Sequence, residues 1–300
     1  MHAEEVDTDV SLVGRLLAAQ FPQWAHLPIE PVDSAGTDNA IYRLGDDRAA
    51  RVPRTQRATW QVDKEHQWLP RLAPNLPLSI PFPLAKGTPA EGYPWHWSVY
   101  RWLEGETATI ERIADPRQAA IDLAQFVAAL RRIDPTGGPP PGPHNFGRGV
   151  PLGLRDAATR TAIASLKGMI DTEAVTAAWD AALKTAAWDR PPVWIHGDLL
   201  PGNLLFGEGG RLSGVIDFGG LGVGDPACDL MVAWTFFSGA SRNAFRAALS
   251  VDDATWARGR GWALSWALIY IPYYLDSNPL GVSAARNTID EVLADHKHAA

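Results

Sequence analysis

Two acids and an amide in the second half of the chain have the types and the spacing to do chemistry. Asp198 and Asn203 stand five positions apart in the segment HGDLLPGN (196–203), and Asp217 follows 19 positions after Asp198. Phosphoryl transfer uses such a set, because one carboxylate orients the attacking hydroxyl while an amide and a second carboxylate hold magnesium against nucleotide phosphates. The spacing therefore predicts that Asp198 orients a substrate hydroxyl or accepts its proton, and that Asn203 and Asp217 bind magnesium.

Short apolar segments are expected to carry both motifs as strands that end in loops. Residues 193–195 (VWI) lead into the first motif, and residues 215–216 (VI) lead into the second. An isolated Asp or Asn would more simply cap a turn, but here two motifs occur together and in the right order. We interpret His196 as a support of the loop. Asp225 is a natural helix N-cap, and Asp229 is predicted to accept hydrogen bonds from N–H groups of the loop.

The turn SAGTDN (34–39) is a candidate for covering a phosphate. Gly36 allows backbone N–H groups to come close to a phosphate, and the hydroxyls of Ser34 and Thr37 would add donors. The alternative is an ordinary hairpin turn. No Gly-x-x-x-x-Gly-Lys-Ser/Thr segment occurs in the chain, which excludes a P-loop.

Arg51 and Glu65 are predicted to form an ion pair. Arg51 lies in a short strand at 48–52, and Glu65 comes 14 positions later, on the apolar stripe of an expected helix at 56–69. A carboxylate among inward-facing apolar residues is costly to bury unless it is paired. The alternative is that Glu65 lies at the edge of the stripe, in water.

The composition is that of an ordinary globular protein with an acidic balance. Hydrophobic residues make up 46% and charged residues 20% of the 300 residues, which excludes a disordered chain and suits one large domain or two lobes. The formal net charge of -7 argues against general binding to nucleic acid or to anionic membranes. It is compatible with a cationic substrate.

Three features predict a cytoplasmic protein. Cys228 is the only cysteine, which excludes an intrachain disulfide. The acidic start MHAEEVDTDV lacks the basic and then apolar pattern of a signal peptide. The longest apolar stretch, 263–275, is too short to span a bilayer and contains Pro272, so no membrane partner is expected.

Periodicity divides the chain into a β-rich first third and a helical remainder. This division predicts an α+β fold with two lobes, at 1–103 and 104–300, and a ligand site between them. Residues 135–143 (PTGGPPPGP) are expected to form a loop. The expected helices lie at 8–21, at 56–69, from Pro116 onward, at 154–168, at 172–187 and in much of the chain after Pro226, and the expected strands lie within 29–45, at 48–52 and at 97–103.

With these residues assembled, the chain resembles the aminoglycoside phosphotransferase family, the antibiotic-kinase branch of the protein-kinase-like fold. Protein kinases have His-Arg-Asp-x-x-x-x-Asn followed by Asp-Phe-Gly, and here Gly197 replaces the Arg. In the family that the chain resembles, His-Gly-Asp-x-x-x-x-Asn is diagnostic. The segments that carry the resemblance are HGDLLPGN (196–203), VIDFGGLGVGDPACDLMVAW (215–234), SAGTDN (34–39) and WSVYRWLEGE (97–106).

The resemblance implies an enzyme that transfers a phosphoryl group from ATP or GTP to a hydroxyl of a small molecule, with Mg2+ as cofactor. It implies Asp198 as the catalytic base and Asn203 and Asp217 as magnesium ligands. The backbone from Tyr100 to Trp102 would bind the adenine or guanine. Arg51 stands where the family more commonly has Lys, and its guanidinium stays charged and can contact two phosphate oxygens at once.

The acceptor remains open between several classes. The acidic charge favours an aminoglycoside antibiotic, whose phosphorylation would confer resistance by adding charge and bulk. An aromatic stripe favours a larger ligand such as a macrolide, unless the stripe packs in the core. Choline, homoserine and fructosamine kinases share the fold, whereas the lack of Ala-Pro-Glu after Asp217 argues against a protein kinase. The stripe consists of Trp262, Trp266, Tyr270, Tyr273 and Tyr274.

A different class of function is a catalytically silent, nucleotide-binding regulator. The joint presence of Asp198, Asn203 and Asp217 argues against this class. Magnesium-dependent hydrolysis of a nucleotide without an acceptor would separate the two.

Overall fold

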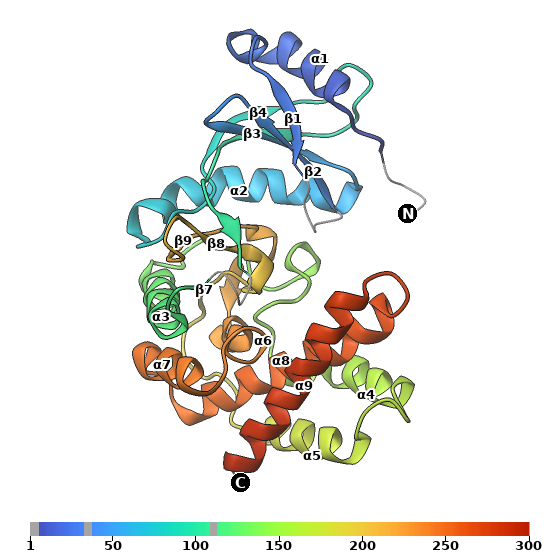
Figure 1. Ribbon diagram of the computed structural model, residues 1–300, viewed down its shortest axis with the longest axis vertical. Coiled ribbons are helices and arrows are strands. Elements are labelled where there is room, and N and C mark those ends of the chain that lie inside the picture. Colours follow the sequence, from blue (N-terminus) through green and yellow to red (C-terminus); the bar gives the residue numbers. More distant parts are fainter. Residues whose placement is uncertain (1–5, 33–37, 109–112, 300) are drawn as a thin grey trace.

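Two lobes make up the protein (Figure 1). The computed structural model describes residues 6–32, 38–108 and 113–299. The smaller lobe is built on a five-stranded antiparallel sheet, and the larger lobe is mainly helical. The expected α+β fold with two lobes is therefore confirmed.

The sheet of the smaller lobe has the strand order β1-β2-β3-β5-β4. The elements of this lobe are α1 (Val10–Gln20), β1 (Ile29–Val32), β2 (Asn39–Leu44), β3 (Arg48–Pro53), α2 (Thr59–Leu72), β4 (Pro83–Gly87) and β5 (Trp97–Arg101). Helix α1 packs an apolar stripe that includes Val13 and Leu17 against the sheet. Asp9 begins this helix by accepting a hydrogen bond from the N–H of Leu12 at 2.6 Å.

Helix α2 lies between the sheet and the larger lobe (Figure 1). Its C-terminal half belongs to the core of the larger lobe, where the ring of Trp68 lies 4.8 Å from the ring of Trp194. The sequence predicted that this helix ends at Leu69, but it continues through Pro70 to Leu72. Burial of both leucines in that core offsets the backbone hydrogen bond that Pro70 cannot make.

Helix α8 runs through the larger lobe and packs against α4, α5 and α9. The helices of this lobe are α3 (Pro116–Arg132), α4 (Asp156–Ser165), α5 (Thr172–Leu183), α6 (Val232–Thr235), α7 (Gly239–Leu249), α8 (Asp253–Tyr274) and α9 (Pro279–Ala299). Asp115 caps α3 by accepting from two backbone N–H groups at 3.0 Å. In the described part of the chain, no helix is long and apolar enough to cross a bilayer.

Short strands bring the two motifs of the larger lobe together. Strand β7 (Val193–Ile195) pairs antiparallel with β10 (Gly222–Gly224), so that Ile195 lies opposite Gly222. The first motif follows β7 directly, and the second directly precedes β10. The remaining strands, β6 (Glu106–Thr107), β8 (Leu204–Phe206) and β9 (Leu212–Val215), form a small separate sheet in the order β6-β8-β9.

Candidate active site

A buried carboxylate holds the start of the loop 196–203. Asp229, which is fully buried, accepts hydrogen bonds from the N–H of His196 at 2.9 Å and from the N–H of Gly197 at 2.7 Å. A buried carboxylate with two N–H donors is well satisfied. The predicted role of Asp229 is confirmed. Asp225, also as predicted, caps the 3₁₀ segment Pro226–Met231.

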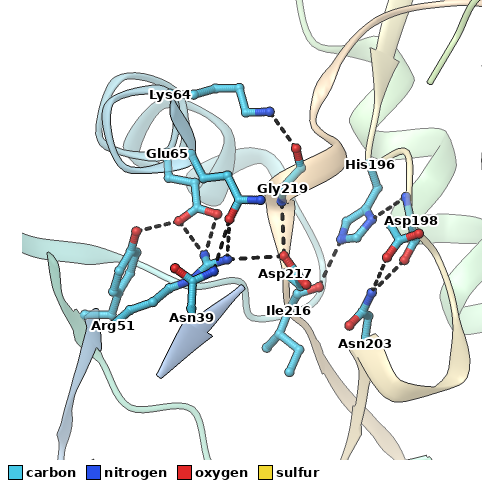
Figure 2. Close-up of polar contacts among 12 residues, drawn as sticks. Asn39, Arg51, Lys64, Glu65, His196, Asp198, Asn203, Ile216, Asp217 and Gly219 are labelled. Carbon is cyan, nitrogen blue, oxygen red and sulfur yellow. Dashed lines mark hydrogen bonds and ion pairs between the residues drawn. The ribbon is translucent and has the colours of Figure 1, made fainter. Parts of the chain in front are cut away.

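His196 connects the two motifs (Figure 2). Its Nδ1 accepts a hydrogen bond from the N–H of Asp198 at 3.2 Å, and its Nε2 lies 3.1 Å from the carbonyl oxygen of Ile216. Since Nδ1 is the acceptor, the proton lies on Nε2 and is donated to Ile216. The ring is buried and packs edge-on against Phe218. His196 therefore supports the loop, as predicted.

Gly197 occupies a position where no side chain fits. Its φ of +82° lies in the left-handed region, and a Cβ would lie 2.3 Å from the carbonyl oxygen of Gly220. The Arg that protein kinases carry at this position is therefore excluded by the backbone that joins the two motifs.

Asp198 is held at both of its carboxylate oxygens. Oδ1 accepts from Nη2 of Arg148 at 3.2 Å, and Oδ2 accepts from Nδ2 of Asn203 at 3.1 Å. Partial burial raises the pKa of Asp198, and the charge of Arg148 acts in the opposite direction. The side chain remains 29% exposed, so the carboxylate can meet a ligand. The sequence analysis did not identify Arg148.

Asn203 and Asp217 present the oxygen donors that magnesium prefers. The amide nitrogen of Asn203 donates to Asp198. The amide oxygen of Asn203, at the other end of the group, is thereby left for a metal ion. Asp217 has a left-handed backbone (φ 60°, ψ 74°), and its Oδ1 accepts from the N–H of Gly219 at 3.2 Å. Its side chain is 45% exposed. One amide and one carboxylate fit magnesium, which usually completes its shell with waters and phosphates.

Arg51 forms the predicted ion pair with Glu65 (Figure 2). Its Nη1 donates to both carboxylate oxygens, at 2.7 and 2.8 Å, and Glu65 is only 1% exposed. Nη2 donates to Oε1 of Gln61 at 2.8 Å and to Oδ1 of Asp217 at 3.3 Å. Burial alone would lower the pKa of Arg51, but Glu65 and then Asp217 outweigh burial and raise it. This arrangement links the smaller lobe to the second motif.

Tyr100 and Trp102 belong to the segment that was predicted to bind the base. Tyr100 lies inside the sheet, between Ala49 and Pro83, and its hydroxyl donates to Glu65. The N–H of Trp102 donates to the carbonyl oxygen of Asp47 at 2.8 Å. A nucleotide base could use that N–H only by displacing Asp47. Binding of the base by the backbone from Tyr100 to Trp102 stays a prediction, with the N–H of Trp102 engaged by the β2–β3 turn.

The turn at 34–39 is described only in part. Ser34, Gly36 and Thr37 lie outside the described residues, so their predicted contact with phosphate stays a prediction. Asn39, the last residue of the turn, lies at the start of β2, where its side-chain amide lies beside Gln61 and the guanidinium of Arg51.

Sequence reasoning also missed Gln61 and Lys64, although a signal was present. Both are buried. Gln61, Lys64 and Trp68 stand at positions i, i+3 and i+7 and therefore share one face of α2. Extending the apolar stripe by this spacing would have predicted that two polar side chains point inward.

The aromatic stripe divides between core and surface. Trp262 is fully buried, whereas Tyr273 is 60% exposed. Between them the rings of Trp266, Tyr270 and Tyr274 follow one another at 5.0 and 4.4 Å and are half-buried. The core interpretation is therefore confirmed for Trp262, and Trp266, Tyr270 and Tyr274 pack against that core while one part of each ring stays exposed.

Comparisons with known proteins agree with this geometry. The model of a phosphotransferase enzyme family matches residues 29–262. YcbJ, an uncharacterised protein of Bacillus subtilis strain 168, is 24% identical over 230 residues, which cover 69% of this chain and 70% of that protein.

Two solved structures show the same fold. The GDP complex of aminoglycoside 2'-phosphotransferase-IIIa is 19% identical, with a TM-score of 0.74, over 96% of this chain and 100% of that one. A macrolide 2'-phosphotransferase type I is 19% identical, with a TM-score of 0.63, over 97% and 98% of the two chains. These likenesses confirm the protein-kinase-like fold. Because the family model matches residues 29–262, well over half of the chain, the chain belongs to the phosphotransferase enzyme family.

Proposed function

We propose that the chain is a magnesium-dependent O-phosphotransferase that moves a phosphoryl group from a nucleoside triphosphate to a hydroxyl of a small molecule. One observation carries this proposal. Asp198, Asn203 and the segment of Asp217 form one hydrogen-bonded array, in which His196 bonds to the N–H of Asp198 and to the carbonyl of Ile216. Such an array holds a proton acceptor and two oxygen donors in a fixed relation.

Asn203 and Asp217 would hold the magnesium ion. When bound, magnesium offsets negative charge on the nucleotide phosphates. Arg51 would add a second positive charge, since its Nη2 already lies 3.3 Å from Asp217. Glu65 keeps that guanidinium in place from the other side.

Asp198 would act on the acceptor. The acceptor oxygen forms a bond to the terminal phosphorus, while the bond from that phosphorus to the leaving nucleoside diphosphate breaks. The proton of the hydroxyl passes to Asp198. Burial raises the pKa of this carboxyl, which makes it a better proton acceptor than an Asp in water, and Arg148 and Asn203 fix its orientation.

We propose that the base of ATP or GTP binds beside the segment that follows β5. In the described part of the chain, the N–H groups of Leu103 and Glu104 have no hydrogen-bond partner, unlike that of Trp102. We also propose that the boundary between the two lobes lies in this segment, between residues 103 and 104. Ser34, Gly36 and Thr37 would cover the phosphates. The cytoplasm supplies both nucleotides and suits the free thiol of Cys228.

Aminoglycosides are the acceptor class that we propose first. The net charge of -7 favours a cationic acceptor, and proteins of the same fold include an aminoglycoside phosphotransferase. Two guanidinium groups refine this proposal. Arg148 bonds to Asp198, and Arg155 lies over the same Trp262 ring as Arg148. They would repel an ammonium group, so the reacting hydroxyl is expected at a part of the acceptor without one.

Macrolides are the second candidate class. The half-buried rings of Trp266, Tyr270 and Tyr274 offer stacked aromatic surface for a large, partly apolar ligand. The fold is also that of a macrolide phosphotransferase.

An acceptor panel tests the proposal. The purified protein would be incubated with magnesium and ATP or GTP, together with aminoglycosides, macrolides, choline or homoserine, while nucleoside diphosphate release and the acceptor mass are followed. The wild type should add one phosphoryl group to an acceptor, and Asp198→Asn should not. Tight nucleotide binding without magnesium-dependent transfer or hydrolysis would favour the regulator instead.

A further inference from the structure

Lys64 is a buried lysine that the proposed chemistry does not use. It stands next to Glu65 on α2 and is only 8% exposed. Its Nζ donates to the carbonyl oxygens of Gly219 at 2.7 Å, Leu221 at 3.1 Å and His144 at 3.3 Å. An ammonium group has three N–H donors, and here three backbone carbonyls receive them.

These carbonyls belong to two loops of the larger lobe, whereas Lys64 belongs to the helix of the smaller lobe. Figure 2 shows the ammonium of Lys64 at the carbonyl of Gly219, while Glu65 turns toward Arg51. Two neighbouring residues of α2 thus bond to different lobes. The bonds of Lys64 add a polar contact with the larger lobe to the apolar packing of the C-terminal half of α2.

Each of the two loops leads to a residue of the proposed site. Gly219 donates its N–H to Asp217, so that loop carries the carboxylate proposed to bind magnesium. After His144, the side chain of Asn145 donates to the carbonyl of Arg148 at 3.1 Å, and Arg148 donates to Asp198. Lys64 is therefore bonded to the loop of Asp217 and to the loop of Arg148, which in turn contacts Asp198.

Charge pairing does not explain the burial of Lys64. In the described part of the chain, no carboxylate lies within ion-pair distance of its Nζ. Burial lowers the pKa of Lys64 to about 8, in spite of the nearby charges of Glu65 and Asp217. Besides the three carbonyls, Nδ1 of His144 lies 3.5 Å from Nζ. A cation held chiefly by carbonyl dipoles makes a directional contact, because these partners are fixed main-chain atoms.

We propose that Lys64 is a positioning residue that fixes α2 against the loops of Arg148 and Asp217, so that Arg51 and the proposed magnesium ligands reach the same nucleotide. This inference rests on the proposed phosphotransferase activity. It assigns Lys64 no contact with substrate.

The experiment compares Lys64→Met, which keeps the length but removes the donors, with Lys64→Gln, which keeps an amide donor. Lys86→Met is the matched control, because Lys86 lies in the same lobe, is exposed and pairs with Asp63 on the surface. Turnover is measured at a temperature where unfolding scans show every variant folded. Lys64→Met should lower kcat about 100-fold and change the nucleotide KM less than about threefold, as expected when reacting groups are slightly misplaced. Lys64→Gln should lose less, and Lys86→Met should match the wild type.

Hydrogen exchange supplies a readout that does not depend on activity. Lys64→Met should speed exchange about tenfold at amides 142–149 and 219–222, and Lys86→Met should not. If the wild type shows no transfer or hydrolysis, the proposed function fails while exchange still decides whether Lys64 fixes the loops. Unchanged exchange in these loops, or a kcat within about twofold of the wild type in folded Lys64→Met, would overturn the proposal.

Discussion

The loop 196–203 and the site around Arg51 are built in different ways. In the loop, side chains bond to the main chain: Asp229 accepts from two N–H groups, and His196 bonds to one N–H and one carbonyl. Around Arg51, side chains bond to side chains, and the chief partners, Glu65 and Gln61, come from α2. The main chain of the loop is therefore held by buried side chains of the larger lobe, whereas the Arg51 site depends on where α2 lies.

A methyl group at Gly197 should have the largest effect. Gly197→Ala forces a Cβ to 2.3 Å from the carbonyl oxygen of Gly220 at a φ of +82°. We expect a loss of about 2–5 kcal/mol in the free energy of unfolding, from strain and from the steric clash together. Urea denaturation measures this loss.

Gly202→Ala is the control within the same loop. A Cβ at Gly202 would meet nothing within 4 Å. The free energy of unfolding should change by about 0.5 kcal/mol or less. Equal losses in the two variants would show that the loop does not depend on the backbone contact at Gly197.

Substitution of Arg51 should change binding more than folding. Arg51→Lys keeps the charge but loses the fork that bonds to Glu65 and Gln61 together. The nucleotide Kd should rise about tenfold, while stability falls by about 1 kcal/mol. Titration calorimetry with magnesium and ATP measures the Kd, and an unchanged value would place the phosphates away from Arg51.

The pH dependence of activity should show the smallest effect. Burial raises the pKa of Asp198 and Arg148 opposes that rise, so Arg148→Met should raise the pKa of Asp198 further. Since the ionised carboxylate accepts the proton, the acid limb of kcat/KM should move to higher pH. Arg155→Met is the control, because Arg155 bonds to Ser265 and not to Asp198. A shift in the control, or none in Arg148→Met, would contradict this account of the carboxylate.

Local patterns in the sequence were enough to predict several features of the molecule. The apolar stripe of α2 located Glu65, and the short apolar segments located the strands before the two motifs. Contacts between distant segments were not predictable in this way. Arg148 approaches Asp198 from 50 positions away, and Lys64 reaches Gly219 across 155.

Tertiary contacts also account for two features that the sequence did not predict. The predicted base-binding segment included Trp102, whose N–H is taken by Asp47 of a neighbouring turn. The predicted end of α2 fell at Leu69, since Pro70 usually stops a helix, but the core of the larger lobe buries the next turn. A single sequence carries no sign of either contact.

The most direct test of the central claim is the turnover of Asp198→Asn with magnesium and nucleotide, with and without an acceptor that the wild type uses. Burial raises the pKa of Asp198 in the folded protein. The ionised carboxylate therefore lowers the stability of the fold at neutral pH, and Asp198→Asn should melt no lower than the wild type there. We predict nucleotide binding within about threefold of the wild type and a kcat lower by about 100-fold or more. A folded Asp198→Asn protein that retains a tenth or more of the wild-type kcat would contradict the claim that this carboxylate carries the transfer.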